Sequence, residues 1–305
     1  MTRISEESLV SVAVITYNSS KYILDTLESI KDQTYSNIEL IISDDCSPDN
    51  TLALCRDWVS VNSCRFTRVE IVESKVNTGI SANMNRAYSA CRGVWIKPIA
   101  GDDVLLSDCI QKNWDFVSNS KREIVFSQME VICDGTAAQD YGEKLFNRYH
   151  KKLSLPRREM NLLILCGNFI PAATTFIKKD LWQSCGEFDE SIPMMEDWPF
   201  WAKLIGMGKN LYYNPVPTVK YRMHGESVSL SEKPSERYLK SVEAAYKYVT
   251  SVQWKYNKLL WLYQRTYGTK FTQNPIKAIV KYTLRVINPM TYYMLYISIK
   301  TRLSK

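Results

Sequence analysis

Two adjacent carboxylates, Asp102 and Asp103, stand directly after an apolar run at residues 94–101. A strand that delivers two carboxylates to one place can hold a hard divalent cation such as Mg²⁺ or Mn²⁺, and such a cation keeps positions open for phosphate. The pair therefore indicates a metal that binds a diphosphate. The same residues could also cap a helix, because the pattern at residues 105–117 predicts a helix behind them. Taken alone, the pair leaves both interpretations open.

The elements before this pair alternate between strands and helices. Apolar and β-branched runs predict strands at residues 9–16, 38–43, 67–72 and 94–99. Helical spacing of apolar residues predicts helices between them, at residues 22–33, 51–59 and 81–91. This alternation is typical of a parallel, doubly wound sheet, in which ligands bind at the carboxyl ends of the strands.

Each of the four predicted strands is followed by polar residues, at 16–18, 44–45, 77–79 and 102–103. Turns are polar in most proteins, so a single cluster means little, but four clusters at one edge favour a ligand site. The motifs GxGxxG and GxxxxGK(S/T) do not occur, which argues against an ordinary dinucleotide site and a P-loop. A bound diphosphate would then need a metal to neutralise it, which points back to Asp102 and Asp103.

Beyond Gly101 the pattern becomes mixed. It predicts strands at 123–133, 174–178, 211–213 and 218–221, and a short helix at 198–205. The polar, basic stretch 134–158 is predicted to be a long connection that could serve as a substrate lid. From Ser235 onward the chain is predicted to be mostly helical.

The charge of the chain is unevenly distributed. The formal net charge is +7, and the segment from Ser235 onward holds thirteen Lys or Arg against two Glu, a local balance of +11. The first 234 residues are left with −4. A slightly acidic body with a basic tail predicts a polyanionic partner for the tail, such as a membrane surface, a nucleic acid or a phosphorylated substrate.

Residues 275–305 mix apolar and basic side chains at helical spacing. No run reaches the ~20 apolar residues that a membrane-spanning helix needs. A helix that lies in the membrane interface, with its Lys and Arg reaching toward the headgroups, fits the pattern. The alternative is a pair of helices that pack on the body, with Trp254, Trp261 and the tyrosines in their core.

The eight cysteines are scattered without a CxxC pair, and the first residues contain no apolar signal-peptide region. These features predict a reduced, cytoplasmic protein rather than a secreted one held by disulfides. The two histidines, His150 and His224, are not paired with cysteines at zinc-ligand spacing, which argues against a zinc site.

Six short stretches occur in an order that resembles a known family, at residues 12–18, 29–34, 39–47, 77–81, 101–103 and 196–198. Over about residues 8–229 the sequence resembles the family 2 glycosyltransferases with a GT-A fold, such as those of bacterial O-antigen and capsular polysaccharide synthesis. The resemblance implies an α/β fold: a Rossmann-like mixed sheet flanked by helices, with a C-terminal helical extension. It implies a nucleotide-sugar-binding half at 1–104, an acceptor-binding and catalytic-base half at 105–234, and a basic helical extension at 235–305.

By position, the resemblance implies a nucleotide-sugar site formed by Thr16, Tyr17, Asn18, Asp45, Asn77, Gly79, Asn85 and Asp102. Thr16 and Tyr17 would hold the base, and Asp45 would hydrogen-bond its edge. Asp102 would contact the ribose. Asp103 and His224 would hold a divalent cation, Mn²⁺ or Mg²⁺.

Asp197, with Glu196 beside it, matches the catalytic base of the family. Burial can raise the pKa of such a carboxylate toward the working pH, and the carboxylate accepts the proton of the acceptor hydroxyl only as the new bond forms. The other interpretation is that Glu196 and Asp197 cap the following helix, with Pro199 in its first turn. Asn168 and Trp198 are candidate acceptor contacts.

Two positions depart from the family pattern. Ala100 stands where the family often has the first acidic residue of its Asp-x-Asp-Asp stretch, and Met84 stands where an arginine often follows the glycine loop. The first departure leaves the division of ribose and metal contacts open. Arg86 could replace the missing arginine only if its helix turns it toward the site.

The resemblance implies a metal-dependent inverting hexosyltransferase that moves a sugar from a nucleotide-diphosphate sugar, UDP-sugars first, to a hydroxyl of a glycan. The expected acceptor is a lipid-diphosphate-linked intermediate of bacterial surface polysaccharide. The basic helices would hold the enzyme peripherally at the inner face of the cytoplasmic membrane, and nucleic acid is not an expected partner. Two alternatives remain: a metal-dependent nucleotidyltransferase, which releases pyrophosphate, and a non-catalytic nucleotide- or nucleic-acid-binding protein with steeply salt-dependent binding.

Overall fold

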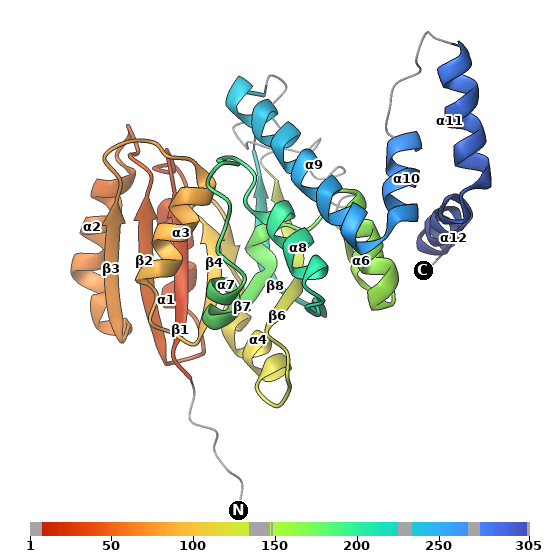
Figure 1. Ribbon diagram of the computed structural model, residues 1–305. Coiled ribbons are helices and arrows are strands. Elements are labelled where there is room, and N and C mark those ends of the chain that lie inside the picture. Colours follow the sequence, from red (N-terminus) through yellow and green to blue (C-terminus); the bar gives the residue numbers. More distant parts are fainter. Residues whose placement is uncertain (1–7, 134–146, 148, 225–233, 268–274, 304–305) are drawn as a thin grey trace, which may run out of the picture.

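The computed structural model describes residues 8–133, 147, 149–224, 234–267 and 275–303. Figure 1 shows one mixed sheet with helices on both faces and a group of C-terminal helices at one end. The sheet has eight strands in the order β3-β2-β1-β4-β7-β6-β8-β5. This mixed α/β sheet and its helical extension confirm the predicted fold class.

The first four strands form the parallel half of the sheet: β1 (Val10–Thr16), β2 (Ile38–Asp44), β3 (Arg68–Glu73) and β4 (Trp95–Ala100). They are connected by the helices α1 (Ile23–Lys31), α2 (Thr51–Asn62) and α3 (Ile80–Ala90). The sequence predicts all seven elements within a few residues of these bounds. Strands that are covered on both faces need nearly continuous apolar runs, and these runs made the strands predictable from the sequence.

Successive residues of β1 enter two different hydrophobic cores. Val12 and Val14 pack in the core that contains Leu27 of α1. The intervening Ala13 belongs to the core that contains Ala87 of α3. Burial of each large aliphatic side chain contributes about 1.5–3 kcal/mol, so both helices are held firmly on the sheet.

The second half of the sheet contains β5 (Val104–Leu105), β6 (Ile124–Cys133), β7 (Thr175–Lys178) and β8 (Tyr212–Met223). Strand β7 runs antiparallel to both β4 and β6, and β8 runs parallel to β6. The helices of this half are α4 (Cys109–Val117), α6 (Arg157–Cys166), α7 (Lys179–Ser184) and α8 (Asp197–Gly206).

Strand β8 corrects the prediction of two short strands. Pro215 and Pro217 cannot donate ladder hydrogen bonds, so the sequence suggests a break at this point. The pairing with β6 instead shifts its register between Ser127 and Met129 and then continues. One irregular strand therefore extends to the carboxyl edge of the sheet.

Two further predictions need correction. The helix predicted to begin at Leu105 begins at Cys109, because Leu105 pairs with β8 as part of β5. Of the connection predicted at 134–158, residues 134–146 and 148 lie outside the described residues, whereas residues 149–153 are helical and α6 begins at Arg157. The sequence pattern also misses α6 and α7.

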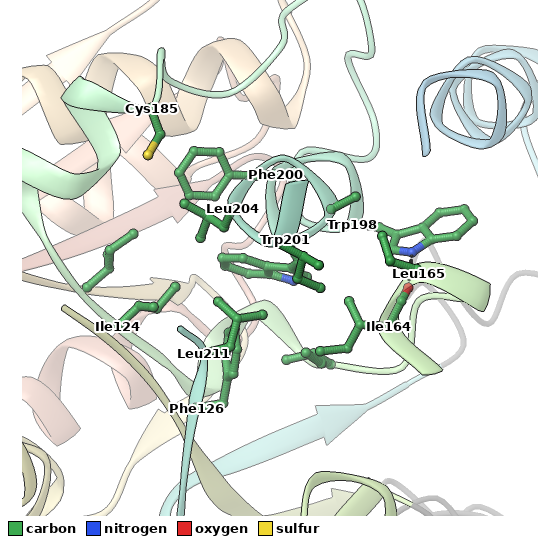
Figure 2. Close-up of a cluster of buried hydrophobic side chains, with 14 of the residues drawn as sticks. Ile124, Phe126, Ile164, Leu165, Cys185, Trp198, Phe200, Trp201, Leu204 and Leu211 are labelled. Atoms are coloured by element: carbon green, nitrogen blue, oxygen red, sulfur yellow. Dashed lines mark hydrogen bonds between the residues drawn. The ribbon is translucent and has the colours of Figure 1, made fainter. Parts of the chain in front are cut away.

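Figure 2 shows how α8 is anchored in the second half of the molecule. Phe200, Trp201 and Leu204 of α8 lie in a cluster with Phe126 of β6. The rings of Phe126 and Trp201 meet edge to face, with centroids 4.9 Å apart. This packing fixes the position of α8, whose first residue is Asp197.

The C-terminal part confirms the predicted helices, as α9 (Glu236–Tyr256), α10 (Lys258–Tyr267), α11 (Pro275–Ile287) and α12 (Pro289–Leu303). Gln253 Nε2 of α9 donates to the carbonyl oxygen of Leu165 in α6 at 2.6 Å. Lys300 Nζ of α12 pairs with Glu159 Oε2 of α6 at 3.0 Å. None of the helices in the described residues is long and apolar enough to cross a membrane.

A buried carboxylate joins the amino ends of several strands. Glu39 of β2 is fully buried and accepts hydrogen bonds from Ser11 Oγ at 2.5 Å and from the N–H of Gly93 at 2.8 Å. The N–H of Arg92 and Arg68 Nη1 donate to it as well, at 2.5 and 3.0 Å. Burial alone would raise the pKa of Glu39, but the four donors outweigh burial and lower the pKa.

We expect Glu39→Gln to lower the free energy of unfolding by about 3 kcal/mol at neutral pH, because the amide leaves buried donors and Arg68 without their anionic partner. A native pKa below the unfolded-state value stabilises the fold above that unfolded value, and this stabilisation is lost as the pH falls through the native pKa. The difference in stability between the variant and the parent protein should therefore shrink as the pH falls below the unfolded-state pKa, about 4.5, and disappear below the native pKa. Denaturant unfolding as a function of pH measures this.

Glu70→Gln is the matched control, because Glu70 is a more exposed partner of the same Arg68. Its loss should cost less than about 1 kcal/mol. Equal losses in the two variants, or a loss in Glu39→Gln that does not depend on pH, would contradict the structural role of Glu39.

Candidate active site

The carboxyl ends of β1, β2 and β4 meet at one edge of the sheet, as the four polar clusters predict. The N–H of Asp45, after β2, donates to the carbonyl oxygen of Thr16 at 3.0 Å. The N–H of Gly101, after β4, donates to the carbonyl oxygen of Ile15 at 2.9 Å. These bonds continue the parallel ladder beyond the strands and place the residues that follow side by side.

Asp45 connects the end of β2 to the loop before α3. Its carboxylate accepts the N–H and the hydroxyl of Thr78 at 3.0 and 2.6 Å, and the N–H of Gly79 at 2.7 Å. Arg86 Nη2 donates to the same carboxylate at 2.6 Å. Burial would raise the pKa of Asp45, but these hydrogen bonds lower it. Asp45 is therefore an anion held in place by the protein itself.

Arg86 turns toward the site. It can therefore replace the arginine that the family often has at the position of Met84. Its Nη1 donates to Thr78 Oγ1 at 2.7 Å while Nη2 pairs with Asp45. Asn85 points elsewhere: its amide donates to the carbonyl oxygen of Phe188 at 3.0 Å and accepts from the N–H of the same residue at 3.1 Å. The structure thus places Asn85 as an anchor for the loop between α7 and α8, the loop that also contacts Gly79.

The end of β1 and the residues after it combine a buried polar atom, an exposed ring and an unusual backbone conformation. Thr16 Oγ1 is buried and has no hydrogen-bond partner among the residues that the structure describes. Tyr17 is 48% exposed, and Asn18 has a left-handed backbone with φ of 54°. A non-glycine residue in this conformation is strained, and such strain is common at functional sites.

The segment 77–79 is pressed against the loop that precedes α8. Gly79 has φ of +98°, and a Cβ there would lie 2.6 Å from the carbonyl oxygen of Pro193. Asn77 Oδ1 accepts from Arg237 Nη1 of α9 at 2.6 Å. Ser81 Oγ donates to the carbonyl oxygen of Ile192 at 2.6 Å. These contacts join the nucleotide-sugar half predicted from the sequence to the segment that carries Glu196 and Asp197.

Asp102 and Asp103 point to different partners. The carboxylate of Asp102 is 30% exposed and its Oδ2 lies 2.9 Å from His224 Nε2, at the end of β8. Asp103 is only 2% exposed, and its Oδ1 accepts the N–H of Arg222 at 2.8 Å. Burial, reinforced by the charge of Asp102, raises the pKa of Asp103 well above its usual value. Asp103 and His224 were the predicted metal ligands. In the structure, the carboxylate that lies within hydrogen-bond distance of His224 is that of Asp102.

Arg222 was not singled out from the sequence. Its Nε donates to the carbonyl oxygen of Asp102 at 2.7 Å, and Nη2 pairs with Asp25 of α1 at 3.0 Å. Its guanidinium also lies 4.6 Å from the ring centroid of Tyr22. The sequence offered one indication of its role. Arg222 stands two residues before His224, a spacing that places both side chains on the same face of an extended chain.

The residues present fit a divalent cation at Asp102 and His224. Asp102 Oδ2 and His224 Nε2 form a hydrogen bond at 2.9 Å, so the two groups converge on one place, as two ligands of one cation must. A partly exposed pair leaves positions for phosphate and water. A mixed carboxylate and imidazole set suits Mn²⁺ better than Mg²⁺, which strongly prefers oxygen. In the described part of the chain, no group of three or more His, Cys, Asp or Glu side chains is arranged to hold a metal.

Glu196 and Asp197 are buried side by side at the start of α8. Asn168 Nδ2 donates to both carboxylate oxygens of Asp197, at 3.0 and 2.9 Å, and the N–H of Trp198 donates at 2.6 Å. Burial raises the pKa of Asp197 and, together with the charge of Asp197, raises the pKa of Glu196 to about 8. A pair of neighbouring carboxyl groups with raised pKa values is suited to proton transfer.

The two predicted acceptor contacts have other partners in the structure. Asn168 orients Asp197 through its two hydrogen bonds to that carboxylate. Trp198 is buried, and its Nε1 donates to the carbonyl oxygen of Ile164 at 2.7 Å (Figure 2). Its ring meets Tyr246 of α9 edge to face, with centroids 4.8 Å apart. Trp198 therefore belongs to the core in this structure, and its contact with an acceptor stays a prediction.

Comparison with known proteins relates this arrangement to one family. A model of the family described as "Glycosyl transferase family 2" matches residues 11–183. The chain is 27% identical to an uncharacterized glycosyltransferase of Haemophilus influenzae, over 72% of this chain and 67% of that protein. It is 26% identical to the putative teichuronic acid biosynthesis glycosyltransferase TuaG of Bacillus subtilis, over 72% and 81%.

The chain is also 26% identical to a chondroitin synthase of Escherichia coli, over 82% of this chain. This chain therefore spans 34% of the length of the chondroitin synthase and 67% of the length of the Haemophilus protein.

Two solved structures share the fold. TarS 1–349 of S. aureus, in complex with UDP-GlcNAc, has a TM-score of 0.62 at 15% identity, over 96% of this chain and 89% of that one. The mannosyltransferase PcManGT of Pyrobaculum calidifontis, in complex with GDP-Man and Mn²⁺, has a TM-score of 0.55 at 16% identity, over 99% and 89%. At such low identities the likeness concerns the fold alone.

The role of Asp45 gives a prediction about stability and exchange. We expect Asp45→Asn to lower the free energy of unfolding by about 2–3 kcal/mol and to speed amide hydrogen exchange at Thr78 and Gly79 about tenfold or more, because their N–H groups lose an anionic acceptor. Arg86→Gln is the matched control, since it removes the ion pair and leaves both N–H bonds in place. Unchanged exchange in Asp45→Asn, or equal acceleration in Arg86→Gln, would show that Asp45 does not hold this loop.

Proposed function

The chain belongs to glycosyl transferase family 2 and has the GT-A fold, and from this premise we propose that it is an inverting glycosyltransferase. The reaction would move a hexose from a nucleoside-diphosphate sugar to a hydroxyl of a glycan. The observation that carries the proposal is the buried carboxylate of Asp197, which is oriented by Asn168 and by the N–H of Trp198.

The nucleoside of the donor is proposed to bind at the edge formed by the ends of β1 and β2. Tyr17 offers an exposed ring on which a base can stack, and Thr16 beside it has a buried Oγ1 without a hydrogen-bond partner among the described residues. Because protein donors surround its carboxylate, Asp45 would act mainly by holding Thr78, Gly79 and Arg86 around the base. A UDP-sugar is the first donor to test, since TarS, which shares the fold, binds UDP-GlcNAc.

Asp102 and His224 are proposed to hold a divalent cation, with Asp103 as the alternative carboxylate. When bound, such an ion supplies positive charge that stabilises the departing diphosphate. Arg222 fixes the two halves of this site to each other, because it bonds the backbone of Asp102 and the carboxylate of Asp103 from the strand that carries His224.

The two carboxyl groups at α8 are proposed to have different protonation states. Burial raises the pKa of both, and the pKa of Glu196 reaches about 8. The side chain of Asn168 and the N–H of Trp198 donate to Asp197 and favour its ionised form. Asp197 therefore ionises first, and Glu196 stays protonated up to about pH 8. This difference makes Asp197 the base and Glu196 a neutral neighbour at physiological pH.

The proposed reaction is a single displacement. The acceptor hydroxyl oxygen bonds to the anomeric carbon while the bond from that carbon to the diphosphate oxygen breaks. The hydroxyl proton passes to the carboxylate of Asp197, and the electron pair of the broken bond leaves with the nucleoside diphosphate. Attack on the face opposite the leaving group inverts the anomeric centre. The protein contributes orientation of both substrates and a positioned base.

The acceptor is proposed to be a glycan carried on a lipid diphosphate, an intermediate of bacterial surface polysaccharide. The name of TuaG refers to teichuronic acid biosynthesis, and the name of the Escherichia coli relative refers to the synthesis of chondroitin. A lipid-linked acceptor would bring the enzyme to the inner face of the cytoplasmic membrane, where the basic C-terminal helices would meet anionic lipid.

The proposed function is tested by release of nucleoside diphosphate from UDP-sugars, followed by GDP- and dTDP-sugars, with Mn²⁺ or Mg²⁺ and a synthetic lipid-diphosphate monosaccharide. Transfer of the sugar to the acceptor supports the proposal. Release of pyrophosphate would indicate a nucleotidyltransferase instead, and binding of donors without turnover of any would indicate a non-catalytic protein.

For the base, we expect Asp197→Asn to lower kcat by about 10²- to 10⁴-fold with little change in nucleotide affinity, because only proton transfer is lost. Glu196→Gln should keep most of its activity at pH 7, since Glu196 is protonated there, and should lose the change in rate that the parent shows near pH 8. Asp189→Asn, in the loop before α8, is the matched control and should retain full activity. A Glu196→Gln variant as impaired as Asp197→Asn would reverse the two roles.

For the metal, we expect Asp102→Asn and His224→Gln each to weaken Mn²⁺ binding about tenfold or more. Calorimetric titration of Mn²⁺ into the protein with bound UDP measures this without turnover, and Asp32→Asn, an exposed carboxylate of the same half, is the control. If Asp103→Asn weakens binding and Asp102→Asn does not, the ion is held by Asp103, as the family pattern suggests.

A further inference from the structure

Helix α12 has two apolar faces, and only one of them is covered. Met290, Met294 and Ile297 are buried in the larger hydrophobic core. The opposite face carries five side chains that are between 48% and 74% exposed: Tyr292, Leu295, Tyr296, Ile299 and Leu303. At 3.6 residues per turn these five lie within an arc of about 100° and form one continuous stripe. We call them the α12 stripe.

Exposed apolar side chains are concentrated in this part of the molecule. Nine of the twenty large apolar side chains that are exposed in the described residues belong to α11 and α12. The four in α11 are Val280, Tyr282, Val286 and Ile287. Single exposed apolar residues need no explanation, but a contiguous group marks a surface that binds something. Figure 1 shows these two helices at the end of the molecule opposite α2 and β3.

Positive charge borders the α12 stripe. By helical position, Lys300 and Arg302 lie on its two sides, each about 80° from Tyr292. Lys300 Nζ lies 5.8 Å from the ring centroid of Tyr296. Residues 275–303 contain five Lys or Arg and no Asp or Glu. An apolar stripe with cations at its borders and tyrosines within it matches a helix that lies in a membrane interface.

We propose that the α12 stripe inserts among the headgroups of a bilayer that contains anionic lipid, with Lys300 and Arg302 at the phosphate level. A second copy of the chain is the other occupant to consider. A two-fold contact through this stripe would bring Lys300 and Arg302 of both copies close together. Glu159 of α6 pairs with Lys300, but the sequence of α11 and α12 offers no acidic residue to compensate Arg302. Anionic headgroups supply the opposite charge, at about 1 kcal/mol for each basic residue near the surface.

Helix α6 lies between α12 and the segment that orients the proposed base, Asp197. Arg158, near the start of α6, lies over the ring of Tyr293, and Glu159 pairs with Lys300. The other end of α6 is Cys166, two residues before Asn168, which orients Asp197. A membrane-bound α12 would therefore hold the acceptor side of the protein near the bilayer. Only this consequence rests on the proposed function; the binding itself does not.

The test is flotation of the full chain with phosphatidylcholine vesicles, with and without about one third phosphatidylglycerol. The parent protein should bind the anionic vesicles and release from them as salt increases. Leu295→Ser/Ile299→Ser should weaken binding about tenfold or more, and Arg302→Gln about fivefold. Val61→Ser on α2, where Val61 is 74% exposed, is the matched control and should bind as the parent does.

Two further measurements keep the outcomes distinct. Thermal unfolding of Leu295→Ser/Ile299→Ser should match the parent, because both side chains are exposed; if that variant is unstable, Tyr292→Ser/Tyr296→Ser replaces it. Turnover with a short, water-soluble acceptor should be unchanged, so failure of the proposed enzymatic function is seen separately from failure of membrane binding. Parent protein that ignores anionic vesicles, a stripe variant that binds as well as the parent, or a parent dimer that the stripe variant turns into a monomer would each overturn the proposal.

Discussion

A buried carboxylate needs hydrogen-bond donors to remain charged, and this constraint separates five buried acidic residues of the protein into two groups. Glu39 and Asp45 each accept four hydrogen bonds, and their pKa values are lowered. They are fixed anions that tie strands and loops together. Asp103, Glu196 and Asp197 are buried with fewer donors, and their pKa values are raised. Residues of this second kind hold a proton more readily than ordinary carboxylates and can respond to a cation, which is the behaviour that chemistry requires.

Asp45, one of the fixed anions, helps to position Glu196 and Asp197, whose pKa values are raised. Asp45 holds Thr78 and Gly79, and the glycine has no side chain, so the loop that carries Pro193 can lie directly on it. That loop leads within a few residues to the carboxylates at the start of α8. The apolar cluster around Trp201 fixes the helix from the other side (Figure 2). The positions of the raised-pKa carboxylates therefore depend on hydrogen bonds and packing made by residues that take no part in the proposed reaction.

The sequence predicted the parallel half of the sheet well, because each strand there is a continuous apolar run and each helix has a clear period. It failed where pairing over a long distance decides the outcome: Leu105 has a helical neighbourhood but pairs with β8, and two prolines suggested a break that β8 bridges by shifting its register. Motifs predicted the edge that gathers Thr16, Asp45 and Asp102. They did not show that Asn85 bonds the loop between α7 and α8, that Trp198 is buried or that Asp102 bonds His224, because side-chain direction depends on contacts between segments far apart in the sequence.

The proposed mechanism is a single displacement assisted by Asp197, and the anomeric configuration of the first-formed product tests it most directly. With a donor and acceptor that turn over, proton NMR of the new linkage shows whether an α-linked sugar of the donor becomes β-linked. We expect inversion. A product that retains the donor's configuration would require two displacements or a front-face mechanism, and it would contradict the role of Asp197 as the base of a single displacement.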